Sequence, residues 1–134
     1  MSEPDLAAIL NHADAEIRAL EDRLDDGAGL PVGATVDVAQ AVAKRLIKGY
    51  LGAATDKPEP QEPADLLTLW KLLVKGDPSW NTIRDNCREL VYYRNCLDAG
   101  RPDALPREPA RMAVRTTRHL HLFIKSRCEQ EGRL

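Results

Sequence analysis

The chain has 134 residues, 43% of them hydrophobic but only 4% aromatic, and a net charge of −2. This length suits one domain, residues 1–134, with an aliphatic core that needs no disulfide or metal. No apolar run approaches about 18 residues and no signal peptide is recognisable, so we expect neither a membrane span nor secretion. The three cysteines lack metal-ligand spacing, which fits reduced thiols in a cytoplasmic protein.

The small net charge hides an uneven distribution of charged residues. Residues 3–26 contain eight acidic side chains and two basic ones, whereas residues 107–127 contain six basic side chains and one acidic one. This split predicts a basic face for an anionic partner, although solvated helix faces often have the same composition.

Apolar residues recur at helical spacing through the first half of the chain, which predicts helices over residues 4–26, 35–51 and 63–74. Residues 27–33 are rich in glycine and are interpreted as a flexible link, and residues 52–62 as a loop. Lys44, Arg45 and Lys48 are the polar residues of the second helix. They are either solvated surface residues or, for Lys44 or Lys48, neighbours of a phosphate.

A fourth helix is predicted over residues 78–99. Asp77 can cap its first free N–H groups, Pro78 suits its first position, and Gly100 ends it. Its apolar stripe consists of Trp80, Ile83, Cys87, Leu90 and Leu97. Arg94 falls on this stripe, and a guanidinium on a desolvated face needs partners or a watery cleft.

The last helix is predicted from residue 108 or 109 to residue 130. One of its faces is apolar, and another is mostly basic, with Arg111, Arg115, Arg118, Leu122 and Lys125. No strand pattern, repeat, phosphate loop or metal-ligand set occurs in the sequence. The whole pattern predicts an all-α fold, an antiparallel bundle of four or five helices.

Residues 94–101 read Arg-Asn-Cys-Leu-Asp-Ala-Gly-Arg. This octet resembles the signature of the HEPN superfamily, whose motif is Arg, a polar residue that is often Asn, a short gap, and His, frequently followed by Gly-Arg. Arg94, Asn95, Gly100 and Arg101 match that motif, but Ala99 stands where it has His. Residues 38–51 also resemble the Gln-Ala-x-x-Lys-x-x-Lys helix that is common in this superfamily, and the likeness extends over residues 6–128.

The resemblance implies a HEPN-like homodimer in which the motifs of two copies meet in one cleft. It implies a metal-independent endoribonuclease without a cofactor, the toxin or effector of a toxin–antitoxin or anti-phage defence system. An antitoxin partner is also implied, either a small nucleotidyltransferase-like protein or a segment that caps the cleft.

These residue types suit RNA cleavage without metal. Arg94 would hold the scissile phosphate and Asn95 would position it, while a histidine at position 99 would transfer protons. Arg94 and position 99 are five residues apart, about 140° around a helix, so two copies can serve one phosphate better than one. Ala99 cannot transfer protons, so this chain is expected to be catalytically inactive. Its alanine is either an engineered replacement or a natural loss.

Arg101, Arg115, Arg118 and Lys125 are the expected contacts to flanking phosphates of RNA, with His119 and His121 on the same basic face. The plain alternative for this face is solvated surface. The alternative function is a non-catalytic helical dimer that binds nucleotides or a partner protein. A third possibility is an interaction domain without any nucleic-acid role.

Overall fold

The computed structural model describes residues 5–27, 29–53, 60 and 64–134, and these residues form helices and no strands. The five α-helices are α1 (Leu6–Asp25), α2 (Val32–Ala53), α3 (Leu66–Val74), α4 (Arg84–Asp98) and α5 (Pro109–Gln130). Two short 3₁₀ helices, η1 (Pro78–Ile83) and η2 (Pro102–Ala104), precede and follow α4. The prediction of an all-α fold of five packed helices is confirmed.

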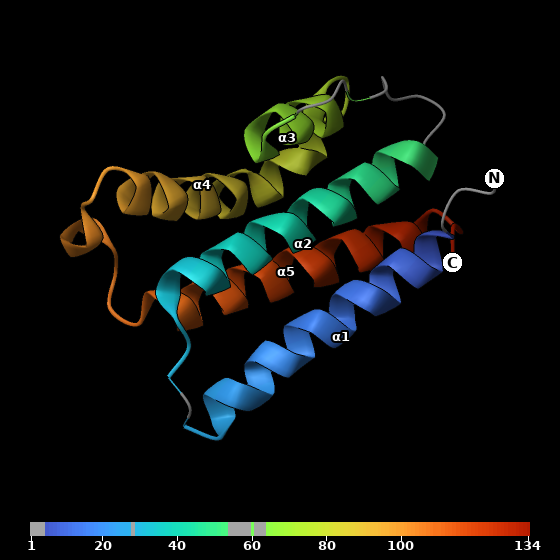
Figure 1. Ribbon diagram of the computed structural model, residues 1–134. Coiled ribbons are helices and arrows are strands. Elements are labelled where there is room, and N and C mark those ends of the chain that lie inside the picture. Colours follow the sequence, from blue (N-terminus) through green and yellow to red (C-terminus); the bar gives the residue numbers. More distant parts are fainter. Residues whose placement is uncertain (1–4, 28, 54–59, 61–63) are drawn as a thin grey trace.

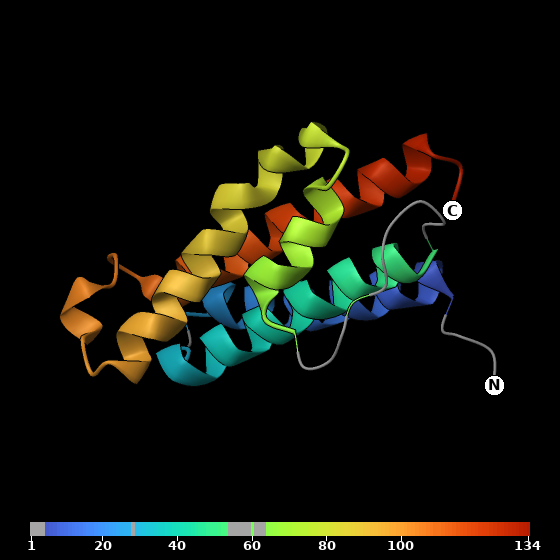
Figure 2. The same ribbon diagram turned by 90° about the horizontal axis from the view of Figure 1, so that it is seen from above.

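The helices α2 and α5 form the centre of the bundle. Helix α1 packs against both on one side, while α4 contacts both from the other side and α3 packs on α2 and α4 (Figure 1). The chain runs in one direction along α1 and α4 and in the opposite direction along α2 and α5 (Figure 1). Seen from above, α3 and α4 lie over α2 (Figure 2). Within the described ranges, no helix has the length and apolar character needed to cross a membrane.

The core is built from the stripes that the sequence predicts. The predicted inward face of α2 is buried, with Val36, Ala39, Ala43, Leu46 and Tyr50. Trp70 is also a core residue, and its indole N–H donates a hydrogen bond to the carbonyl oxygen of Trp80 at 3.0 Å. Burial of each large aliphatic side chain contributes about 1.5–3 kcal/mol, so these stripes supply most of the stabilisation.

Several predicted boundaries are wrong. Helix α2 begins at Val32, because the Thr35 N–H donates to the carbonyl oxygen of Pro31, so part of the expected link is helical. The segment predicted as the start of the fourth α-helix is the 3₁₀ helix η1, in which the Trp80 N–H donates to the Asp77 carbonyl oxygen. Asp77 is nevertheless the predicted cap. Residue 63, the predicted start of the third helix, lies outside the described residues, and α3 begins only at Leu66, after its cap Asp65.

The acidic first helix and the basic last helix meet in the fold. The guanidinium of Arg118 on α5 donates to Asp14 at 2.7 Å and to Glu21 at 2.8 Å, both on α1. His121, one turn further along α5, is buried, and its Nε2 lies 3.2 Å from the carbonyl oxygen of Leu10. Its Nδ1 lies 3.1 Å from Arg118 Nη1. An arginine can only donate, so Nδ1 accepts and the Nε2–H of a neutral imidazole donates to Leu10.

The contacts of Arg118 and His121 with α1 make the free energy of unfolding depend on pH. Burial, and next to it the charge of Arg118, lowers the pKa of His121 below its usual 6.5. A neutral His121 is thus favoured in the folded chain, whereas the unfolded chain binds a proton near pH 6.5. The stability that this group contributes is present above that pH and is lost as pH falls through the lower pKa of the folded state. The hydrogen bond from Arg118 likewise lowers the pKa of Asp14, whose contribution is lost in more acidic solution.

We therefore expect the free energy of unfolding, measured with urea, to decrease as pH falls from 7.5 to 5. The variant His121→Gln keeps an amide donor for Leu10 but has no proton to gain, so its decrease over this range should be smaller. His119→Gln, on the exposed side of α5, is the matched control and should behave like the native chain. Equal pH dependence in the native chain and His121→Gln would contradict this account.

Candidate functional site at the end of helix α4

Helix α4 ends as its sequence predicts. Gly100 has φ +67°, in the left-handed region that glycine adopts without strain. The N–H of Gly100 donates to the Leu97 carbonyl oxygen at 3.1 Å, and the N–H of Arg101 donates to that of Cys96 at 2.8 Å. These two bonds are a Schellman motif, which satisfies carbonyl groups that a helix end leaves free. The motif fixes where Ala99 and Arg101 leave the helix.

Arg94 lies at the seam between α4 and α2, where 27% of its side chain is exposed. Its Nη1 donates to Asp37 on α2 at 2.6 Å, and its Nε donates to Asp98, one turn along α4, at 3.0 Å. These hydrogen bonds, first that of Asp37, raise the pKa of Arg94 above its usual value. The partners that the sequence required for this guanidinium are therefore two carboxylates. Both carboxylates are largely exposed, so solvent reaches the guanidinium.

Asn95 and Ala99 lie on the outer surface of α4. Both are exposed and one helical turn apart, and the Ala99 N–H donates to the Asn95 carbonyl oxygen at 2.9 Å. A larger side chain at position 99 would project beside Asn95 into solvent. Arg94 instead contacts α2, so one copy directs the arginine and position 99 to different sides of the helix.

Arg101 is exposed and follows the helix end directly. Its guanidinium binds Asp103 through two hydrogen bonds of 3.1 and 3.0 Å, a fork-to-carboxylate arrangement within the turn that contains η2. This contact lowers the pKa of the Asp103 carboxyl. Like Arg94, this candidate phosphate ligand already has a carboxylate partner.

The four basic candidates do not form one surface. Arg115 and Lys125 are exposed on α5 and, in the part of the chain that the structure describes, neither has an ion pair. Arg118 instead turns towards α1, which lies across the bundle from α4 (Figure 1). The expectation that His121 lies on the outer basic face is wrong, because its ring is buried against Leu10.

Sequence reasoning missed the residues that hold α4 in place. Beside Asp37, Gln40 of α2 donates its amide N–H to the Leu90 carbonyl oxygen at 3.1 Å. From the other side, Glu89 accepts hydrogen bonds from Thr116 of α5 and from Tyr93. In the sequence, the spacing of Asp37 and Gln40 indicates that both lie on one side of α2, on neighbouring turns. It does not indicate that α4 is the helix they contact.

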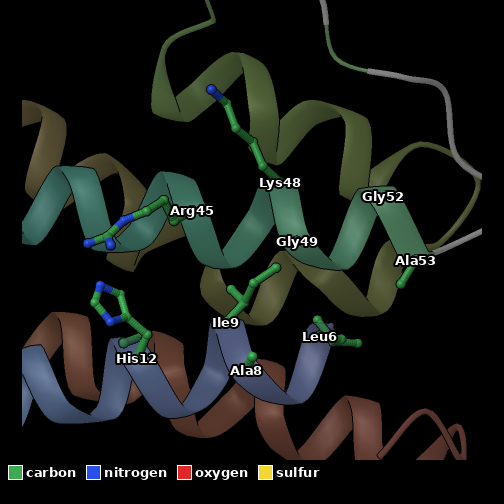
Figure 3. A pocket seen from close by; sticks show the side chains of 10 residues that line it. Leu6, Ala8, Ile9, His12, Arg45, Lys48, Gly49, Gly52 and Ala53 are labelled. Atoms are coloured by element: carbon green, nitrogen blue, oxygen red, sulfur yellow. The ribbon is translucent and has the colours of Figure 1, made fainter. Parts of the chain in front are cut away.

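A hollow of about 580 Å³ lies elsewhere, between α1 and α2. Ile9 fills the space beside Gly49, where an added Cβ would come within 3.0 Å of Ile9 Cδ1 (Figure 3). At one end of the hollow His12 and Arg45 point towards each other, and both contact Glu16 (Figure 3). Arg94, Asn95, Ala99 and Arg101 do not line it.

The described residues contain no group of three or more His, Cys, Asp or Glu side chains placed to hold a metal. The three cysteines are free and buried, and burial raises the pKa of Cys87 to about 12. Comparison with family models, curated proteins and solved structures finds no match to this chain.

The geometry of Arg94 generates a prediction about anion binding. In Asp37→Asn one carboxylate partner of the guanidinium is lost, which leaves Nη1 freer for a phosphate oxygen. We expect the NMR signal of the Arg94 Nε–H to respond to pyrophosphate at a lower concentration than in the native chain. Exposed ion pairs contribute little to stability, so the variant should remain folded.

Asp103→Asn is the matched control, because it releases Arg101 and leaves the partners of Arg94 unchanged. Its Arg94 signal should respond like that of the native chain. If Asp37→Asn also responds like the native chain, Asp37 does not compete with anions for this arginine.

Proposed function

We propose that this chain is a HEPN-type RNA-binding domain that keeps the phosphate-binding part of a metal-independent endoribonuclease site and lacks its proton-transferring part. The observation that carries the proposal is the position of Arg94, whose guanidinium is held at a partly exposed helix seam, next to Asn95 in the chain and five residues before Ala99. The five-helix fold and the Gly100 stop agree with the resemblance of residues 94–101.

The proposed site is shared between two copies of the chain. Within one copy Arg94 faces α2 while position 99 faces solvent, about 140° away around the helix. A homodimer in which the ends of two α4 helices lie side by side would place position 99 of one copy opposite Arg94 of the other. RNA phosphate would then compete with Asp37 and Asp98 for the guanidinium.

Each residue has a chemical role in this site. Arg94 binds two phosphate oxygens and offsets negative charge, and the Asn95 amide can donate to a third. A histidine on the exposed position 99 would titrate near pH 6.5, which suits proton transfer at neutral pH. Alanine has no such proton. Because positioned acid–base groups contribute about 10²- to 10⁴-fold to rate, the chain with Ala99 should bind RNA without cleaving it.

The biological setting follows from the resemblance. The active form of such a domain would be the toxin or effector of a toxin–antitoxin or anti-phage system. An antitoxin protein would bind over the end of α4 and block access of RNA to Arg94.

A second candidate is a non-catalytic helical dimer that binds nucleotides or a nucleotidyltransferase-like partner protein. The ion pairs favour it: both Arg94 and Arg101 already have carboxylate partners. In this interpretation the role of Arg94 is to fasten α4 to α2. The absence of a titratable group at position 99 is then a property of the natural protein.

Restoring the missing imidazole separates the two candidates. Ala99→His should cleave single-stranded RNA in the presence of a metal chelator at least about 100-fold faster than the native chain, with the highest rate near neutral pH. Adding Arg94→Ala should abolish the cleavage. The reaction is followed by separating labelled RNA fragments on a denaturing gel.

Ala99→Gln is the control for size and polarity, because its side chain cannot transfer protons, and it should leave RNA intact. If Ala99→His also leaves RNA intact over the same pH range while remaining folded and dimeric, the ribonuclease interpretation fails and the second candidate gains support.

A further inference from the structure

The outer face of α4 carries a continuous polar stripe. Its members succeed one another at spacings of four or three residues, so they lie on one side of the helix. Its polar members, all exposed, are Arg84, Arg88, Tyr92 and Asn95, and the exposed C-cap Ala99 follows them. The opposite side, with Cys87 and Leu90, is buried. From Arg88 to Ala99 the stripe extends about 16 Å along the helix axis, since each residue adds about 1.5 Å.

Tyr92, at the centre of this stripe, is a large aromatic side chain with 49% of its surface exposed. Its hydroxyl donates a hydrogen bond to the carbonyl oxygen of Ala104, in η2, at 3.0 Å. The ring is therefore held at both ends, by the helix backbone and by this bond. A fixed ring loses little conformational freedom when a flat group stacks on it.

Positive charge is available next to this ring. Arg88, one turn before Tyr92, is exposed and has no ion pair in the described part of the chain, whereas Arg84 contacts Asp85 at 3.5 Å. On the other side, Arg101 lies in the same turn as the hydroxyl's acceptor, because the Ala104 N–H donates to the Arg101 carbonyl oxygen at 3.1 Å and the Ala104 carbonyl accepts from Tyr92. One arginine therefore lies one helical turn before Tyr92, and the other lies in the turn that the Tyr92 hydroxyl contacts.

We propose that Tyr92 is a stacking platform for one unpaired base of RNA, with Arg88 and Arg101 contacting the phosphates on either side and Asn95 the sugar or base edge. The inference rests on the proposed function and defines its substrate class as single-stranded RNA. Unpaired bases can stack on an aromatic side chain, whereas the bases of an RNA duplex stack on one another and are out of reach.

The outer face of α5 offers a useful contrast. It has two cations, Arg115 and Lys125, and its exposed apolar residue is the aliphatic Leu122. An aliphatic side chain has no flat face for a base, so we assign contact with phosphates alone to that face. On α4, by contrast, an exposed aromatic ring, an arginine without an ion pair among the described residues, and an amide lie within one stripe.

The test uses a short single-stranded RNA that contains the fluorescent base 2-aminopurine. Stacking of this base on a tyrosine changes its fluorescence, so titration with the native chain should show the change upon binding. Tyr92→Phe keeps the ring and should bind within about twofold of the native chain. Tyr92→Leu should abolish the fluorescence change and weaken binding about five- to one-hundred-fold, the range expected for loss of one stacked base.

Two matched pairs of variants control for folding and charge. Leu122→Ala removes an exposed apolar side chain from α5 and should leave the fluorescence change intact. Arg88→Gln should weaken binding more than Arg84→Gln, because Arg84 already has Asp85 as its partner. Circular dichroism and thermal unfolding establish that each variant is folded.

The failures of the two proposals are distinguishable. If the native chain binds RNA in an Arg94-dependent way but Tyr92→Leu binds as tightly with the same fluorescence change, the stacking inference is overturned and the proposed function stands. The inference is also overturned if an RNA duplex binds as tightly as the single strand, or if Tyr92→Leu alters only the oligomeric state. If the native chain binds no RNA, both proposals fail.

Discussion

The ion pair between Arg94 and Asp37 joins the candidate site to the rest of the fold. Asp37 belongs to α2, the central helix, and Arg94 to α4, so the pair holds the guanidinium in one place before any ligand arrives. Gln40 strengthens the same seam through the Leu90 carbonyl oxygen. A phosphate that binds here must exchange with a carboxylate. Little conformational entropy of the Arg94 side chain is then lost on binding. The affinity depends on how much more strongly the guanidinium binds phosphate than it binds the carboxylate.

Elsewhere in the molecule, other arginines are also held by carboxylates of other segments. Arg118 of the basic last helix pairs with Asp14 and Glu21 of the acidic first helix, so part of the charge asymmetry of the sequence is used inside the fold. At the far end of α5, Arg127 joins Glu131 to Asp77 and lies over the ring of Trp80 at 4.7 Å. Arg88, Arg115 and Lys125 have no ion pair in the described part of the chain, so they can contact an anionic partner without first losing a carboxylate, whereas Arg94 and Arg101 must exchange theirs.

Periodicity predicted the helices and their buried faces because burial of one apolar stripe depends on local spacing. The Asp77 cap and the Gly100 stop were predictable for the same reason, since each acts within a turn of its own position. Contacts between helices were not predictable. The sequence showed that Arg94 needed a partner, but Asp37 is 57 residues away. It also placed Arg118 on a basic face without indicating that α1 would cover it.

The central claim is that Arg94 binds an RNA phosphate, and the salt dependence of RNA affinity tests it most directly. Affinity for one single-stranded RNA would be measured over a series of salt concentrations in the native chain, Arg94→Lys and Arg94→Ala. The account predicts that Arg94→Ala binds at least about tenfold more weakly and that its slope of log affinity against log salt is smaller by about one, with Arg94→Lys in between. Equal affinities and equal slopes in the native chain and Arg94→Ala would contradict it.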